Sequence, residues 1–264
     1  MDAAHSEDAG QPLLHVRDVA VRFGGIVALD GVSFDVAPGR IVGLIGPNGA
    51  GKTTLFNCIS RLYPCERGSI EFDGVSLLDV PRHGVARLGI GRTFQNLALF
   101  GTMSVLDNVM VGRHCRMRGG FLANALRLPF ALESDKETRK KAEALLALLG
   151  LERFADTRVA ELPFGTQKRV ELGRALAAEP RLLLLDEPAS GLNHEEVGAI
   201  GELIRRLRAE LKLTVLLVEH HMQLLMSLSD WVVALNFGKR IAEGAPADVR
   251  NHPELVRAYL GTGA

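Results

Sequence analysis

Two stretches near the start of the chain, residues 19–23 and 32–36, place apolar side chains at every second position. A period of two predicts strands that bury one face. The run from Ile41 to Ile45 is apolar along its length, which is typical of a central strand buried on both faces. A glycine-rich loop follows, and a helical pattern then extends from about Lys52 to Arg61.

Between about residues 96 and 160 the strand-like runs disappear. A charged stretch, residues 133–141, precedes leucines at helical spacing over residues 145–149, and Gly150 suits the end of a helix. We therefore expect an inserted all-helical lobe. Residues 1–12 are polar and contain no apolar core, so we expect a disordered leader and not a signal peptide.

Strand-like runs return at residues 182–185, 215–218 and 231–235, with helical patterns between them. Alternation of strands and helices predicts an α/β fold, in which helices cover both faces of a parallel sheet. The last stretch, Pro253 to Leu260, is interpreted as a short terminal helix.

Composition narrows the classes of partner. The 264 residues include 31 Lys+Arg and 31 Asp+Glu, so the formal net charge is zero. Proteins that bind nucleic acid usually carry a basic excess, so no nucleic-acid partner is expected. No apolar run approaches the roughly 20 residues that span a bilayer. The three cysteines lack metal-ligand spacing, and we interpret them as reduced thiols of a cytoplasmic protein.

The glycine-rich loop carries the first candidate chemistry. It reads Gly46-Pro47-Asn48-Gly49-Ala50-Gly51-Lys52-Thr53, which fits the phosphate-loop pattern G-x-x-x-x-G-K-[ST]. Backbone N–H groups at a helix N-terminus bind polyphosphate, and glycines let the backbone approach it closely. Lys52 can reach the β- and γ-phosphates, and the Thr53 hydroxyl can ligate Mg²⁺. The loop therefore predicts ATP binding with Mg²⁺.

Charged residues follow two of the expected strands. Asp186 and Glu187 end the run 182–185, at the sheet edge where ligands of parallel sheets bind. We expect Asp186 to hold Mg²⁺ through water and Glu187 to polarise an attacking water. Glu219-His220-His221 follows the next strand, and an imidazole there can contact the γ-phosphate, although the pattern leaves open which histidine acts. Together these residues predict ATP hydrolysis.

From about residue 13 to 261 the chain resembles the ATP-binding subunits of ABC transporters. In this resemblance Phe23 stacks on adenine, residues 46–54 (through Thr54) form the Walker A motif, and Gln95 is the Q-loop glutamine, which joins the Mg²⁺ shell and senses the membrane subunit. The Leu182–Pro188 segment matches Walker B, with Glu187 as the catalytic base, and His220 matches the switch histidine. The D-loop match is Ser190-Gly191-Leu192-Asn193.

The signature motif departs from the family. Where LSGGQ is usual, the chain has Leu162-Pro163-Phe164-Gly165-Thr166. The serine that bonds the γ-phosphate on the opposite subunit is replaced by Pro163, so that contact must be lost or replaced. Gly165 and the N-terminal dipole of the following helix remain to meet the phosphate. Asn193 stands where the D-loop usually has Asp, and His221 where Asp often follows the switch histidine.

The resemblance implies a P-loop NTPase (RecA-like) parallel core sheet with an antiparallel β subdomain and an inserted helical subdomain. It implies a RecA-like and β lobe at about 13–95 and 171–250, a helical lobe at about 96–170 and a C-terminal helix at about 251–261. It also implies a head-to-tail dimer with a second ATPase subunit, either a copy or a paralogue. Two membrane permeases would hold the pair at the inner face of the cell membrane, and a periplasmic or surface solute-binding protein would contribute indirectly.

Less specific features resemble the ATPases of branched-chain amino acid importers. These are the LPFG signature, the long insert at about 116–140 and the ending 251–261. ATPases of urea or short-amide importers share much of this pattern, and a soluble non-transport ABC ATPase or a small-molecule kinase are less favoured alternatives. Residues after Gln95 either line a docking groove for the permease or belong to the helical core; they are Leu97, Leu99, Phe100, Met103 and Val105.

Overall fold

The structure is a computed structural model that describes residues 11–95, 97–116 and 129–260. The expected leader lies almost entirely outside these residues, as does much of the expected insert at 116–140. A six-stranded sheet of order β10-β9-β3-β8-β7-β6 forms the centre, and only its edge strand β10 runs antiparallel. Its strands are β3 (Ile41–Ile45), β6 (Ile90–Arg92), β7 (Leu182–Asp186), β8 (Thr214–Val218), β9 (Trp231–Asn236) and β10 (Lys239–Gly244).

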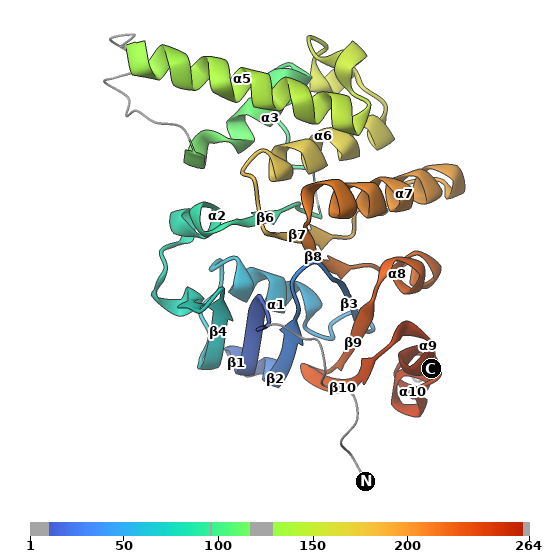
Figure 1. The fold of residues 1–264 in the computed structure, drawn as a ribbon. Coiled ribbons are helices and arrows are strands. Elements are labelled where there is room, and N and C mark those ends of the chain that lie inside the picture. Colours follow the sequence, from blue (N-terminus) through green and yellow to red (C-terminus); the bar gives the residue numbers. More distant parts are fainter. Residues whose placement is uncertain (1–10, 96, 117–128, 261–264) are drawn as a thin grey trace.

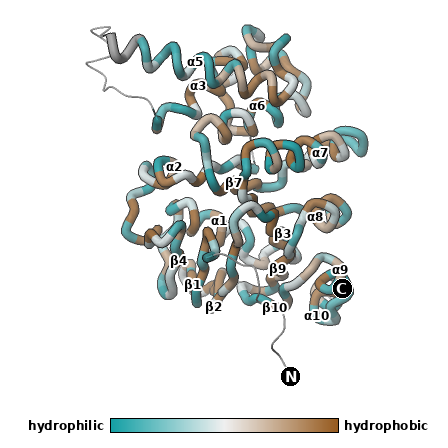
Figure 2. Tube along the Cα trace, in the orientation of Figure 1, coloured by the Kyte–Doolittle hydropathy of each residue, from teal (hydrophilic) through white to brown (hydrophobic). Residues whose placement is uncertain are grey.

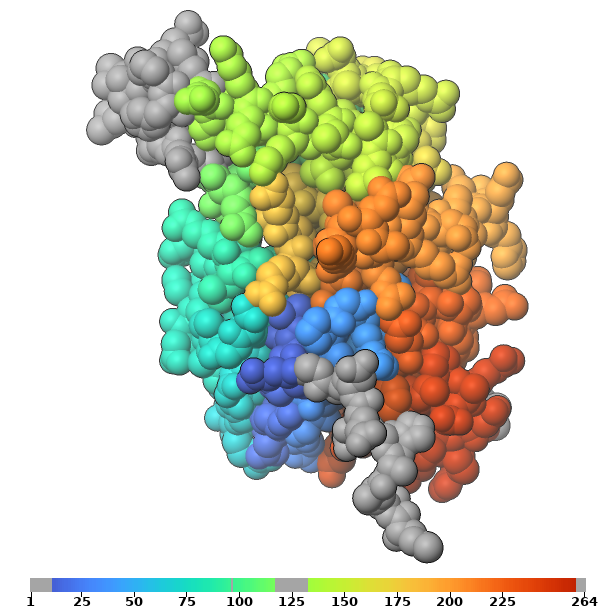
Figure 3. Space-filling model, in the orientation of Figure 1, coloured from blue at the N-terminus to red at the C-terminus, as the bar shows by residue number. Residues whose placement is uncertain are grey.

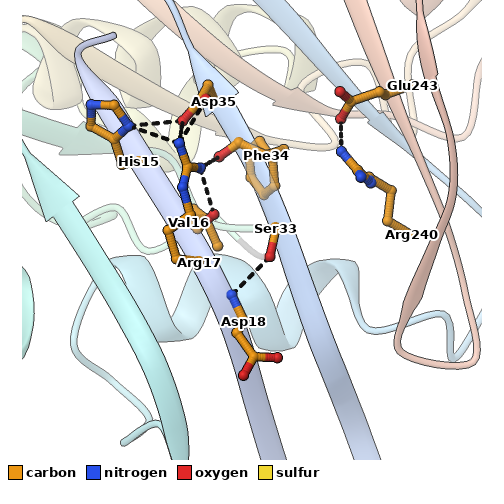
Figure 4. Close-up of polar contacts among 9 residues, drawn as sticks. All are labelled: His15, Val16, Arg17, Asp18, Ser33, Phe34, Asp35, Arg240 and Glu243. Atoms are coloured by element: carbon orange, nitrogen blue, oxygen red, sulfur yellow. Dashed lines mark hydrogen bonds and ion pairs between the residues drawn. The ribbon is translucent and has the colours of Figure 1, made fainter. Parts of the chain in front are cut away.

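A second, antiparallel sheet has the order β2-β1-β4-β5. It consists of β1 (Leu14–Phe23), β2 (Ile26–Val36), β4 (Arg67–Phe72) and β5 (Val75–Ser76). Its solvent face carries a polar cluster in which Asp35 pairs with His15 at 2.9 Å and with Arg17 at 2.7 Å (Figure 4). These contacts join neighbouring strands and raise the pKa of Arg17, chiefly through its hydrogen bond to Asp35.

Helices gather at one end of the molecule, above the central sheet in Figure 1. Those of this lobe are α3 (Val105–Gly112), α5 (Pro129–Leu149) and α6 (Phe164–Leu176). The expected lobe boundary near residue 170 falls inside α6. Gly150, just after α5, has a φ of +66°, the left-handed conformation expected of a glycine that ends a helix. Figure 3 shows this lobe in green and yellow beside the orange helix α7.

The remaining helices flank the sheets. They are α1 (Lys52–Ile59), α2 (Val85–Leu88), α7 (His194–Leu211), α8 (Met222–Leu228), α9 (Pro246–Arg250) and α10 (Pro253–Leu260). Helix α10 matches the expected terminal helix, and β3 matches the expected central strand. Short 3₁₀ turns occur at Leu77–Asp79, Arg82–Gly84, His114–Arg116, Glu152–Phe154 and Val159–Glu161. Within the described ranges, no helix is both long and apolar enough to cross a membrane.

Apolar side chains from both faces of the central sheet form the core. Leu44 packs toward α1 and the antiparallel sheet, whereas Leu183 and Leu185 pack toward the helical lobe and α7. A smaller cluster joins Ile45 to Val249 and Leu255 of the C-terminal helices. The central strands are accordingly mostly brown in Figure 2. The architecture confirms the α/β P-loop class, with an antiparallel sheet and an inserted helical lobe.

Candidate functional site

The phosphate loop connects β3 to α1, and its conformation explains its glycines. Gly46 has a φ of +152°, and a Cβ there would lie 2.1 Å from the carbonyl oxygen of Leu235. Gly51, with a φ of +102°, is the N-cap of α1, and its Cβ would meet the Ala28 carbonyl oxygen at 2.6 Å. Gly49 has a φ of +79° and faces open space. The loop thus needs glycine for its close backbone contacts and leaves room above Gly49.

A cavity of about 810 Å³ opens over this loop. Its walls come from the start of β2, the phosphate loop with the first turn of α1, and the ends of three other segments. The lining residues are Ile26, Val27, Ala28, Asn48, Gly49, Ala50, Gly51, Lys52, Thr53, Thr54, Gln95, Glu187 and His220. The structure therefore brings together the loop, the glutamine, the glutamate and the histidine singled out from the sequence. Sequence reasoning missed the contribution of residues 26–28.

Lys52 is folded back onto its own loop. Its Nζ donates hydrogen bonds to the carbonyl oxygens of Gly46 at 2.6 Å and Pro47 at 3.0 Å. The side chain is buried, which lowers the pKa of Lys52, while the negative charges of Glu187 and Asp186 act in the opposite direction. Lys52 is thus a desolvated amine in the wall of the cavity.

Glu187 is held by two side chains from other segments. Its Oε2 accepts a hydrogen bond from Nε2 of Gln95 at 3.1 Å, and its Oε1 lies 2.7 Å from Nε2 of His220. The backbone of Glu187 has a φ of +51°, an unfavourable value for a residue with a side chain. Side chains that follow β6 and β8 therefore both contact the carboxylate that follows β7.

The structure separates the two adjacent histidines. His220 lines the cavity, with 44% of its side chain exposed. His221 is instead the N-cap of α8, where its Nδ1 accepts a hydrogen bond from the Leu224 N–H at 3.3 Å. Of the two, only His220 lies where it can act on a bound ligand.

Asp186 ends β7 behind the cavity and is 1% exposed. Its Oδ2 pairs with Arg92 at 2.9 Å, while its Oδ1 has no hydrogen-bond partner in the protein. Burial raises the pKa of Asp186, and the hydrogen bond from Arg92 opposes that shift. Sequence reasoning gave Arg92 no role, because no local signal marks its pairing with a residue 94 positions further along the chain.

Oxygen donors suited to Mg²⁺ lie close in the fold. Thr53 is exposed and lines the cavity together with Gln95. Oδ1 of Asp186 accepts no hydrogen bond from the protein. The described residues contain no group of three or more His, Cys, Asp or Glu side chains able to hold a metal. A single carboxylate with a hydroxyl fits a hard cation that shares its remaining positions with water and phosphates.

Phe23 ends β1, and its ring is 44% exposed. It packs edge-on against Tyr63, with ring centroids 5.0 Å apart. It is not part of the cavity wall, which begins three residues later at Ile26. An exposed ring beside the cavity is compatible with stacking on a base.

The signature segment lies away from this cavity. Pro163 is the N-cap of α6, and its carbonyl oxygen accepts hydrogen bonds from the Thr166 and Gln167 N–H groups. Phe164 is half-exposed and packs against Gly191 of the D-loop segment. The helix therefore begins at Phe164, so the first-turn N–H groups of Phe164 and Gly165 have no partner within the helix itself. Leu162 is buried below them.

Asn193 occupies a helix-capping position. Its side-chain oxygen accepts a hydrogen bond from the Glu196 N–H at 3.0 Å, and Glu196 returns one to the Asn193 N–H at 3.0 Å. This reciprocal arrangement is a capping box at the start of α7. Asn and Asp cap helices about equally well, so the departure at position 193 preserves the local structure.

A groove of about 530 Å³ lies on the other side of β6. Arg92, Phe94, Ala98, Phe100 and Arg174 are among the residues that line it. Phe100 is 49% exposed there. Of the other candidates, Val105 is buried in the helical core and Leu99 packs against that core, so these two belong to the lobe rather than to the groove wall.

Comparison with known proteins gives consistent matches. Residues 29–190 match the family described as ABC transporter, and residues 239–264 match the family described as branched-chain amino acid ATP-binding cassette transporter. The chain is 41% identical over 251 residues to the high-affinity branched-chain amino acid transport ATP-binding protein BraF of Pseudomonas aeruginosa, over 95% of this chain and 98% of that protein. It is 40% identical to LivG of Escherichia coli, with the same coverage.

Solved structures agree with these matches. The ADP conformation of MJ1267, an ATP-binding cassette of an ABC transporter, superposes with a TM-score of 0.82 at 31% identity, covering 96% of this chain and 100% of that one. The dimeric structure of the bacterial ABC transporter cassette MJ0796 gives a TM-score of 0.74 at 27% identity, covering 88% and 98%.

Proposed function

The chain belongs to the ABC transporter family of ATP-binding proteins, whose members are ATPases, and we propose that it hydrolyses ATP to power the uptake of branched-chain amino acids. The match of residues 239–264 to a branched-chain amino acid transporter family supports the substrate class. The relatives BraF and LivG, named for high-affinity branched-chain amino acid transport, support it further.

ATP would bind over residues 46–54, with its phosphates in the space above Gly49 and its base beside Phe23. Lys52 would exchange the carbonyl oxygens of Gly46 and Pro47 for phosphate oxygens, which better satisfy its charge. The residues present fit Mg²⁺, which Thr53, Gln95 and Asp186 would hold, Asp186 through water. When bound, the ion neutralises charge on the phosphates.

Glu187 would act as the general base, accepting a proton from the attacking water. His220, at 2.7 Å, holds the carboxylate in place and can also reach the γ-phosphate side of the cavity. Gln95 occupies the second carboxylate oxygen in this structure, so it must move aside or share that oxygen for Glu187 to engage water. The position of Gln95 would thereby regulate the base.

A second ATPase subunit, either a copy of this chain or a paralogue, would complete each ATP site. The signature segment Leu162–Thr166 would serve the partner's nucleotide. Pro163 has no hydroxyl to replace the usual serine, so the N–H groups of Phe164 and Gly165 at the start of α6 would carry that contact. Ser190, Gly191 and Leu192 would line the same interface, and Gly191 already supports Phe164.

Two membrane permeases would dock at the groove beside β6 and place the chain at the inner face of the cell membrane. Exposed Phe94 and Phe100 supply apolar contacts of the kind that bury well against a partner helix. A solute-binding protein would deliver the amino acid to the permeases and would not contact this chain.

The observation that carries the proposal is the convergence of Lys52, Gln95, Glu187 and His220 on one cavity over a phosphate loop. The test is uptake in vesicles that contain the chain with branched-chain amino acid permeases and a solute-binding protein from the same organism. We expect ATP-dependent accumulation of leucine, isoleucine or valine. Accumulation of urea or a short amide alone would reject the substrate class, and uptake independent of ATP would reject the mechanism.

A further inference from the structure

The guanidinium of Arg92 is held on three sides within the protein. Its NH2 group donates to Oδ2 of Asp186 at 2.9 Å, and its NH1 group donates to Oδ1 of Asn57 at 2.8 Å and to Oγ of Ser60 at 3.0 Å. Asn57 lies on α1, and Ser60 directly follows that helix. Arg92 therefore ties the carboxylate at the end of β7 to the helix that begins at the phosphate loop.

Aromatic rings hold the same guanidinium from the remaining directions. Its central carbon lies 5.6 Å from the ring centroid of Phe56 and 5.3 Å from that of Phe94. Phe56 is fully buried, whereas Phe94 is 39% exposed. The planar guanidinium thus rests on one fixed ring and on one ring that faces solvent.

Arg92 also lines the groove beside β6, together with Phe94 and Ser60. Its side chain is only 9% exposed, and that of Asp186 is 1% exposed. A partner that binds against Phe94 in the groove would therefore contact the ring on which the Arg92 guanidinium packs, and the same guanidinium donates a hydrogen bond to Asp186. The Arg92 side chain thus spans the distance between the groove and the buried carboxylate.

The pair leaves one polar atom on each side without a hydrogen bond. Oδ1 of Asp186 and Nε of Arg92 are both buried without a hydrogen-bond partner. A buried ion pair resists separation, because either group left alone becomes an uncompensated charge. A cation at Asp186 also competes with any second cation for the same carboxylate. Movement of Arg92 therefore changes how strongly Asp186 attracts a metal ion.

We propose that Arg92 is a positioning residue that couples the groove to the metal-binding carboxylate Asp186. Its guanidinium holds one oxygen of the carboxylate that would take the metal, Oδ2 of Asp186 at 2.9 Å. A partner that shifts Phe94 shifts Arg92 and thereby alters the affinity of Asp186 for Mg²⁺. This inference rests on the proposed function, in which Asp186 holds Mg²⁺ and the groove receives a permease.

Magnesium titrations of the purified chain, at a fixed concentration of a fluorescent, non-hydrolysable ATP analogue, test the first step. Arg92→Gln removes the competing cation, so we expect half-saturation at a Mg²⁺ concentration about five- to tenfold lower than in wild type. Thermal unfolding of the metal-free variant should occur at a lower temperature and recover more than wild type when Mg²⁺ and nucleotide are added. A half-saturating Mg²⁺ concentration in Arg92→Gln that is equal to or higher than that of wild type would overturn the proposal.

A double-mutant cycle tests transmission through Arg92. Phe94→Ala does not touch Asp186, yet it should lower the half-saturating Mg²⁺ concentration about two- to threefold, because it releases the guanidinium. In the Arg92→Gln background the same change should have no further effect. Independent, additive effects of the two substitutions would show that the groove does not act through Arg92.

Two further variants separate charge from geometry. Arg174→Gln is the matched control, because Arg174 lines the same groove and bonds the Ala98 carbonyl without contacting Asp186; its Mg²⁺ dependence should equal that of wild type. Arg92→Lys keeps the charge but not the planar fork, so it should keep half-saturation within about twofold of wild type while abolishing the effect of Phe94→Ala. If Arg92→Gln does not fold, the Arg92→Lys variant and its double-mutant cycle with Phe94→Ala test whether the groove acts through Arg92.

The outcomes also distinguish the inference from the function on which it rests. No Mg²⁺-dependent nucleotide binding by the wild-type chain would contradict the proposed function. Normal Mg²⁺-dependent binding by wild type, with an equal shift in Arg92→Gln and Arg174→Gln, would contradict only the role of Arg92.

Discussion

The Nε2 atom of His220 lies 2.7 Å from Oε1 of Glu187, although the two residues follow different strands. The contact lets the imidazole hold one oxygen of the carboxylate in place. Gln95 donates to the other oxygen of the same carboxylate at 3.1 Å. The proposed base is therefore oriented by one side chain that follows β8 and one that follows β6.

Lys52→Ala is expected to weaken ATP binding at least about tenfold, because the variant loses the one buried amine at the phosphate loop. Equilibrium titration with a fluorescent ATP analogue measures the loss. Lys140→Ala, on the exposed face of α5, is the control and should bind like wild type. Equal affinity in both variants would rule out the assigned role of Lys52.

Phe100→Asp is expected to uncouple ATP hydrolysis from transport, because it places a charge in the groove proposed to receive the permease. Nucleotide affinity should stay unchanged, since Phe100 does not line the ATP cavity. Vesicle uptake and ATPase rates measured on the same preparation give the coupling ratio. Val75→Asp, at an exposed apolar position outside the groove, should couple normally. Coupled transport by Phe100→Asp would show that the permease docks elsewhere.

Glu171 connects α6 to the segment before Gln95, accepting a hydrogen bond from the Phe94 N–H at 3.0 Å. Burial raises the pKa of Glu171 above its usual value near 4.5. A raised pKa in the folded state favours folding below about pH 4.5, and this contribution is lost as pH rises through the folded pKa.

Glu171→Gln can keep the hydrogen bond through its amide oxygen and carries no charge to bury. The variant should therefore unfold at nearly the same denaturant concentration as wild type near pH 4.5 and at a higher one at pH 8. Urea unfolding across this range measures the difference. Glu161→Gln, at an exposed position, should show no such gain. A Glu171→Gln variant less stable than wild type at pH 8 would contradict the assigned burial penalty.

Asn193→Ala removes the capping box of α7 and should lower the free energy of unfolding by about 1 kcal/mol. Asn193→Asp, which restores the usual D-loop residue, should retain most of that stability because an aspartate caps equally well. Denaturant unfolding of the three proteins provides the comparison. Equal stability of Asn193→Ala and wild type would mean that the cap contributes nothing measurable.

Much of the fold followed from local patterns. The strand Ile41–Ile45 has the bounds that its apolar run predicted, because such a run reports burial on both faces directly, and the terminal helix spans Pro253–Leu260 as interpreted from the sequence. Short polar motifs likewise predicted which residues would meet at the cavity, since the ends of parallel strands share one edge of a sheet. The choice between His220 and His221 needed the structure, because neighbouring residues differ only in the direction of their side chains.

Long-range pairings could not be predicted in this way. The contact between Arg92 and Asp186 joins residues 94 positions apart, and no local pattern encodes such a pair. The same holds for Phe164 on Gly191 and for the separation of Leu99 in the helical core from Phe100 in the groove. The first contact depends on the pairing of β6 with β7, and the others depend on how the helical lobe packs against the sheet.

ATP hydrolysis by Glu187→Gln, compared with wild type in the same purified preparation, tests the central claim most directly. The amide keeps the shape of the carboxylate but cannot accept the proton of water. We expect ATP binding within about twofold of wild type and hydrolysis slower by about two to four orders of magnitude. Hydrolysis at the wild-type rate by a folded, ATP-binding Glu187→Gln protein would contradict the account.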